Sequence, residues 1–142
     1  GIYSRVESTG FGNAGQINVT AGDLEVSKGA NLTTSTDGKG KESLSTRAGD
    51  VTITVTGDVL FDGNGQFNPR LKDRSNPDSP GTSRPSGVYS NLKAEAQGRS
   101  GNITITAGNL TVSNGATLYT STRGIGDAGN ITIDVRGRAL FS

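Results

Sequence analysis

The chain has 142 residues, of which 30% are hydrophobic and 5% aromatic, and its formal net charge is +1. It contains no Cys, His, Met or Trp, which excludes disulfides, thiolate chemistry and histidine as a general base or metal ligand. The charge balance excludes a long-range field that would attract nucleic acid, and no apolar segment is long enough to predict membrane insertion.

Short strands with alternating apolar residues are predicted from the first residues onward. Residues 1–8 form one strand that ends a unit, and three strands follow at 16–21, 23–27 and 31–36. Period-2 alternation gives each of them one apolar and one polar face, as a half-buried strand requires. The residues predicted to point inward are Ile17, Val19, Leu24, Val26 and Leu32.

The same unit returns further along the chain. The second unit supplies Val51, Ile53, Val59 and Phe61, then Val88 and Leu92 after a long loop. The third supplies Ile103, Ile105, Leu110, Val112 and Leu118, and the fourth supplies Ile131, Ile133, Ala139 and Phe141. Two insertions interrupt the units, at 41–46 and 63–86. We expect both to be dispensable for folding, because neither contributes a repeating inward position.

Sequence identity supports this division into units. Residues 1–40 align without a gap on residues 87–126 with 20 identities, and residues 47–62 align on 127–142 with 8. One unit cannot bury its apolar face alone, so stacked units about 4.8 Å apart must do so. The sequence therefore predicts an all-β parallel β-helix over residues 1–142, with three strands per rung and about four rungs. The competing fold, a β-sandwich, accounts for neither the matching columns nor insertions at the same corners.

Two stretches resemble a known family. Residues 101–118 read Gly-Asn-Ile-Thr-Ile-Thr-Ala-Gly-Asn-Leu-Thr-Val-Ser-Asn-Gly-Ala-Thr-Leu, and residues 121–131 read Ser-Thr-Arg-Gly-Ile-Gly-Asp-Ala-Gly-Asn-Ile. They are similar to filamentous-haemagglutinin-type exoproteins, above all to the long cyanobacterial members. The resemblance implies that the β-helix is right-handed, that the protein is exported by two-partner secretion, and that it acts at the cell surface or in an extracellular filament.

All three tyrosines occupy one position of the repeat. Tyr3, Tyr89 and Tyr119 share it with Thr33, which predicts an outward ladder on the third strand of each unit. Such a stripe of aromatic rings suits stacking against sugars. The alternative is that the rings only stabilise neighbouring strands, by about 0.2–1 kcal/mol per pair.

The long insertion is the second candidate site. Residues 63–86 contain all four prolines and the four cations Arg70, Lys72, Arg74 and Arg84. A long loop on a rigid solenoid is a usual place for a binding function. A solvated insertion without a ligand is the equally weighted alternative.

Two further patterns bear on function. The outward positions of the first strands are mostly Thr, as an ice-binding face needs, but Asn18 and Asp134 interrupt them, and Thr also suits exposed strands. A polysaccharide lyase or hydrolase would need converging carboxylates. Asp23 and Asp58 share a corner position with Asn109 and Arg138, which is typical of structural corner residues.

The sequence thus predicts a structural or adhesive segment of a secreted bacterial surface protein. We expect no enzymatic activity, catalytic residue, cofactor or metal site, and no nucleic acid or membrane among the partners. Glycans or cell-surface receptors are the expected ligands. Exposed strand edges also predict end-to-end self-association into filaments.

Overall fold

The computed structural model describes residues 1–7, 10, 12–37, 46–64, 85–93 and 96–142. These residues contain strands and no helix. The first sheet consists of β2 (Ile17–Ala21), β6 (Val51–Val55), β10 (Ile103–Ala107) and β14 (Ile131–Val135). The second consists of β3 (Leu24–Val26), β7 (Asp58–Asp62), β11 (Asn109–Ser113) and β15 (Ala139–Phe141). The third consists of β1 (Ile2–Val6), β4 (Asn31–Thr36), β8 (Gly87–Leu92) and β12 (Thr117–Thr122).

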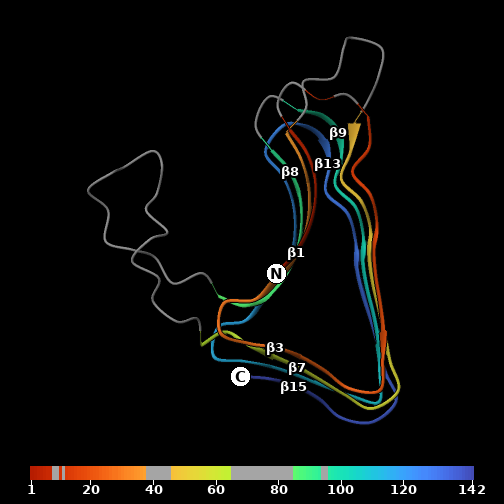
Figure 1. Cartoon of the computed structure of the whole chain (residues 1–142), viewed down its shortest axis with the longest axis vertical. Helices are drawn as coiled ribbons and strands as arrows, with labels where there is room; N and C mark the ends of the chain where they lie inside the picture. The colour runs from red at the N-terminus through yellow and green to blue at the C-terminus, as the bar shows by residue number, and fades with distance from the viewer. Residues whose placement is uncertain (8–9, 11, 38–45, 65–84, 94–95) are drawn as a thin grey trace, which may run out of the picture.

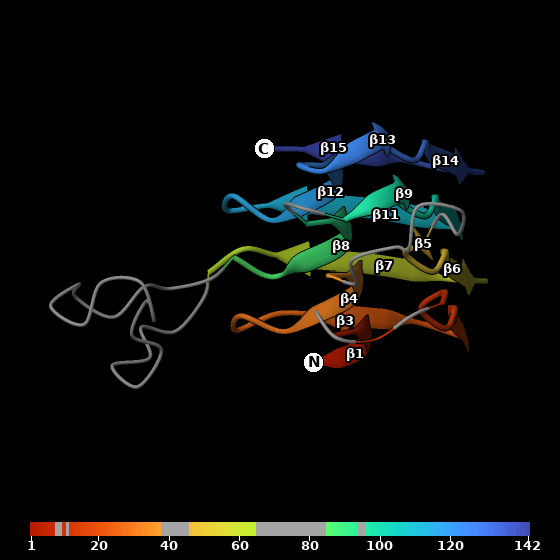
Figure 2. The ribbon, with the colours of Figure 1, turned by 90° about the horizontal axis from the view of Figure 1, so that it is seen from above.

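Neighbouring strands in these sheets are parallel throughout. The chain passes repeatedly from the first sheet to the second and then to the third, so each sheet collects one strand from every turn (Figure 1). Seen from the side, the turns lie on one another in chain order (Figure 2). This arrangement is consistent with a parallel β-helix or solenoid, and the parallel pairing rules out the antiparallel sandwich.

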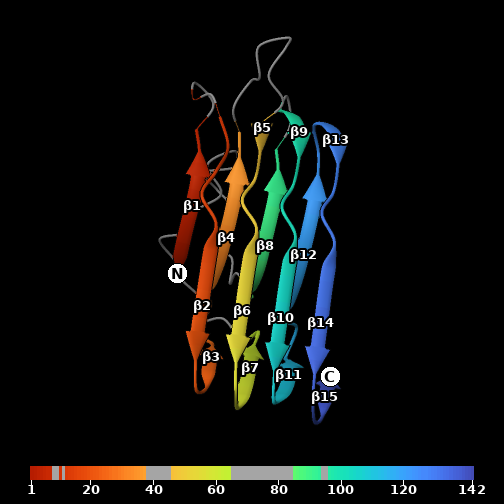
Figure 3. The same cartoon turned by 90° about the vertical axis from the view of Figure 1, so that its right-hand side faces the viewer.

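The predicted inward column of the first sheet is confirmed. Ile17 pairs with Val51, Val51 with Ile103, and Ile103 with Ile131. The first three are buried, whereas Ile131, in the edge strand β14, is 40% exposed (Figure 3). The second sheet adds another inward column, in which Phe61 lies fully buried between Val26 and Val112. The core is therefore a set of like-on-like columns of β-branched, leucine and phenylalanine side chains.

The inward face of the third sheet contains hydroxyls among its apolar side chains. Thr34 and Ser90 are adjacent in register and fully buried. The Thr34 hydroxyl donates to the Gly49 carbonyl oxygen at 2.5 Å, and the Ser90 hydroxyl oxygen accepts a bond from the Gly101 amide at 2.8 Å. These buried hydroxyls thus satisfy backbone groups at the corner that opens the first sheet.

Glycine is required at this corner because consecutive turns approach closely there. A Cβ atom on Gly101 would collide with the backbone carbonyl of Gly49, and one on Gly129 would collide with that of Gly101. The Ala-Gly and Ser-Gly pairs that precede each first strand therefore allow the turns to stack at strand-pairing distance.

A fourth, shorter sheet corrects the prediction of three. It consists of β5 (Thr46–Arg47), β9 (Gln97–Arg99) and β13 (Ile125–Asp127), again in parallel order. Thr46 belongs to the insertion that the sequence predicts to be dispensable, but it is 2% exposed and its hydroxyl donates to the Gln97 carbonyl oxygen at 3.0 Å. The other insertion ends on a structural residue too, since buried Ser86 accepts a hydrogen bond from the Gly29 amide. Residues 38–45 and 65–84 lie outside the described residues.

The position of a residue within a column determines how much its side chain stabilises the fold. Ile105 and Ile133 are partners in register, but Ile105 is fully buried and Ile133 is 37% exposed. We expect Ile105→Ala to lower the free energy of unfolding by about 2–5 kcal/mol, the usual range for such a truncation in a core. Ile133→Ala, the matched control, should lower it by less than half as much. Urea unfolding followed by circular dichroism measures both, and equal losses would contradict the stacking.

Candidate functional site

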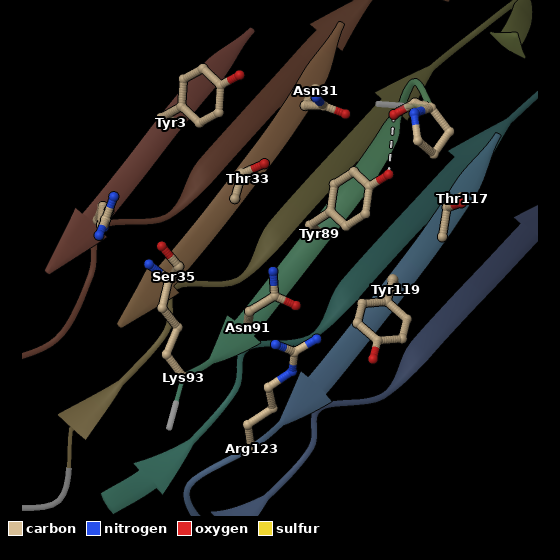
Figure 4. A pocket seen from close by; sticks show the side chains of 12 residues that line it. Tyr3, Asn31, Thr33, Ser35, Tyr89, Asn91, Lys93, Thr117, Tyr119 and Arg123 are labelled. Carbon is tan, nitrogen blue, oxygen red and sulfur yellow. Dashed lines mark hydrogen bonds between the residues drawn. The ribbon is translucent and has the colours of Figure 1, made fainter. Parts of the chain in front are cut away.

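The outward face of the third sheet contains a shallow groove of about 570 Å³. β1, β4, β8 and β12 supply its floor, and Pro85 lies at its edge. Alternating residues of each strand point outward, so the groove is lined by parallel rows of side chains that cross the strands (Figure 4). A first row holds Asn31 and Thr117, and it is followed along the strands by an aromatic, a polar and a charged row.

The aromatic row is the predicted tyrosine ladder. Tyr3 pairs with Thr33, Thr33 with Tyr89, and Tyr89 with Tyr119, which confirms the shared position and the adjacency of the last two rings. The rings of Tyr89 and Tyr119 have centroids 6.5 Å apart and meet edge to face at 64°. Tyr3 is 67% and Tyr119 44% exposed. Because the Tyr89 hydroxyl donates to the Pro85 carbonyl oxygen at 3.1 Å, that ring is held at the edge of the groove.

The polar row lies two residues further along each strand. It contains Arg5, Ser35, Asn91 and Ser121, in register. The Ser121 hydroxyl donates to Asn91 Oδ1 at 3.0 Å, which orients the amide of Asn91 on the groove floor. Ser35 is buried and the Ser121 hydroxyl is bonded to Asn91, so the amide of Asn91 is the neutral polar group that this row offers to a ligand beside the aromatic rings.

The charged row lies two residues further still and changes sign along the stack. Backbone hydrogen bonds continue the register past the strand ends and place Glu7, Asp37, Lys93 and Arg123 in successive turns. Asp37 Oδ2 lies 3.2 Å from both Arg5 and Lys93, and Arg5 also lies 3.2 Å from Glu7. Among the described residues, none forms an ion pair with Arg123.

Sequence reasoning found the tyrosines and missed the two rows beside them. The signal was present, since Tyr89, Asn91 and Lys93 follow one another at period 2, as do Tyr119, Ser121 and Arg123. An alignment of equivalent columns does not reveal these rows, because their residue types differ from unit to unit; they emerge only along the outward face of each strand.

The long insertion, the second candidate site, leaves and rejoins the stack near the groove. Arg70, Lys72, Arg74 and Arg84 lie outside the described residues. The insertion leaves the stack after Asp62, where hydrogen bonds from the Asn114 side chain and the Asn64 amide lower the pKa of the Asp62 carboxyl. It returns at Pro85, next to the tyrosines. Its two ends are thus fixed at one corner of the stack.

The corner carboxylates and amides bond to the backbone of the adjacent turn. Asp23 Oδ1 accepts from the Asp58 amide at 2.8 Å, and Asn109 Oδ1 accepts from the Arg138 amide at 2.8 Å. Asp50 Oδ1 likewise accepts from the Asn102 amide at 2.7 Å. These contacts confirm their placement as corner residues. No group of three or more acidic, histidine or cysteine side chains suited to a metal ion occurs in the described part of the chain.

The threonine array also has the predicted register. The outward positions of the first sheet are Asn18, Thr52, Thr104 and Thr132 in one row, and Thr20, Thr54, Thr106 and Asp134 in the next. Both interruptions lie at the ends of the rows, in β2 and β14. The face is polar, and apart from Asp134 these eight positions carry no aromatic or charged side chain.

Comparison of the chain with protein-family models, with curated protein sequences and with solved structures finds no match. In the described residues, no helix has the length and apolar character needed to cross a membrane.

Proposed function

We propose that the chain is a shaft segment of a secreted bacterial adhesive protein, and that it binds glycans through the tyrosine groove. In this proposal the stack is a right-handed β-helix with three principal strands per rung, to which the fourth sheet adds a short side. The observation that carries the proposal is the tyrosine ladder, because it places exposed aromatic rings beside the amide of Asn91 on a rigid sheet.

The chemistry of this groove suits sugars. A pyranose ring has an apolar face of C–H groups, which packs on an aromatic ring, and a rim of hydroxyls, which needs hydrogen-bond partners. Tyr119 offers an exposed ring, and Asn91 lies in the next row. Because three of the four ladder positions are tyrosine, a polymer that follows the groove along the stack would meet more than one aromatic ring.

The shaft role rests on the repetitive architecture. Each turn pairs with the turns above and below it through three or four parallel strands, which gives a stiff rod that grows by repetition. The resemblance of residues 101–118 and 121–131 to filamentous-haemagglutinin-type exoproteins supports the same role and an extracellular location. A polysaccharide-degrading role has less support, since the described corner carboxylates bond to backbone amides. The only support for ice binding is that most outward residues of the first sheet are threonine.

Tyrosine substitutions test glycan binding. We expect Tyr89→Ala and Tyr119→Ala each to weaken binding of a neutral or acidic oligosaccharide by about tenfold, as loss of an aromatic stacking partner typically does. Tyr119→Phe, the matched control, keeps the ring and should retain binding within about twofold. A glycan array followed by titration calorimetry measures the change. If the alanine variants bind the oligosaccharide like the original chain and lose only stability, the tyrosines stabilise the sheet and do not bind glycans.

End-to-end self-association is a further part of the proposal. In the 142-residue chain, β14, β15, β12 and β13 are edge strands at one end of the stack, and β1, β2, β3 and β5 at the other. Exposed apolar side chains lie at both ends, among them Ile2 and Phe141, which are 53% and 59% exposed. Unpaired strand edges with apolar side chains favour pairing with a second copy.

Lysine substitutions at the two ends test this association. We expect Ile2→Lys or Phe141→Lys to weaken self-association by about tenfold, because each places a charge on an apolar edge. Thr54→Lys adds the same charge to an outward position within the stack and is the matched control. Light scattering over a wide concentration range measures the self-association. A strictly monomeric profile of the original chain would exclude the association.

A further inference from the structure

The charged row beside the tyrosines is unbalanced at one end. It runs Glu7, Asp37, Lys93, Arg123, so its two cations lie on adjacent strands. Like charges directly opposite each other on paired strands are destabilising. The Asp37 carboxylate offsets Lys93 at 3.2 Å, but among the described residues no carboxylate lies within ion-pair distance of Arg123. An external anion near Arg123 would therefore relieve the repulsion.

Arg123 is placed to act together with the tyrosines. Its side chain extends over the groove toward Asn91 and Tyr119, as the close view shows (Figure 4). A guanidinium binds a carboxylate through two parallel hydrogen bonds, which fixes its orientation as well as its position. A ligand whose ring lies on Tyr119 would therefore meet Arg123 with a group on the rim of that ring.

The spacing of the turns matches a polymer of sugars. Successive strands lie about 4.8 Å apart, close to the length of one hexose unit in an extended polysaccharide. The ring positions of the groove fall on four successive strands, occupied by Tyr3, Thr33, Tyr89 and Tyr119. A chain that runs along the stack would thus present about one sugar to each turn.

We propose that the groove binds an acidic polysaccharide, with uronate rings on Tyr89 and Tyr119 and a uronate carboxylate on Arg123. This rests on the proposed glycan-binding function and specifies its ligand. A more densely charged polymer fits the groove less well, because Asp37 and Glu7 occupy the other half of the charged row. A polyuronate carries one carboxylate per sugar, which suits a site with one unpaired cation. Nucleic acid carries a charge about every 1.7 Å of duplex, so it is one of the more densely charged polymers that fit less well.

Titration calorimetry with oligogalacturonates of two to six units, and with their methyl-esterified forms, tests the proposal. The ester removes the charge and keeps the ring. We expect the acidic oligomers to bind about tenfold more tightly than the esters, with an advantage that falls as salt increases. Affinity should rise with length up to about four units, the number of strands in the ladder, and then level off.

Arginine variants locate the charge contact. Arg123→Gln should remove the preference for the acid over the ester and leave binding of the ester within about twofold. Arg136→Gln, an exposed arginine beyond the end of β14, is the matched control and should keep the preference. Circular dichroism should show the same β-sheet signal for both variants.

The outcomes separate this inference from the proposed function. If acid and ester bind equally and both depend on Tyr89 and Tyr119, the groove binds glycans but the charge assignment is wrong. If dextran sulfate or a single-stranded oligonucleotide binds more tightly than the oligogalacturonates, the assignment to uronates is wrong. If none of these ligands binds, both the inference and the proposed function fail.

Discussion

Parallel pairing in register between consecutive turns is the constraint on which the rest of the structure depends. It places each residue of one strand beside its equivalent in the next, as Ile103 lies beside Val51 and Ile131. At strand-pairing distance, the corners must be free of side chains, which requires Gly49 and Gly101. The core can then consist of thin columns of similar side chains, and a chain with only 30% hydrophobic residues can fold around it.

The same register builds the candidate site. A residue type that recurs in successive units becomes a row on the surface, so the tyrosines form a ladder without any loop to position them. Residues two and four places further along a strand join the same face, which brings Asn91 and Arg123 beside the rings. A rigid, repeating face of this kind would offer several contacts at once to the polymeric glycan that we propose as its ligand.

The sequence predicts what recurs in the repeat and misses what does not follow its apolar pattern. The column of Ile17 and the tyrosine ladder were predicted because each unit repeats them at one position. The fourth sheet was missed because Gln97–Arg99 contains no apolar residue, so no alternation indicates a strand. Thr34 and Ser90 stand two residues after the inward Leu32 and Val88, but a hydroxyl gives no apolar signal, and the glycine backbone groups that it bonds become neighbours only in the stacked fold.

Disulfide trapping tests the in-register stacking most directly, because the chain has no cysteine of its own. Thr52 and Thr104 are outward partners on adjacent strands, whereas Thr52 and Thr132 lie two strands apart. At about 4.8 Å between strands, the first pair lies within disulfide range and the second, at about twice that distance, lies outside it. We expect Thr52→Cys with Thr104→Cys to form an intramolecular disulfide on mild oxidation, and Thr52→Cys with Thr132→Cys to remain reduced in dilute monomer. Mass spectrometry showing the reverse result, or equal oxidation of both pairs, would contradict the account.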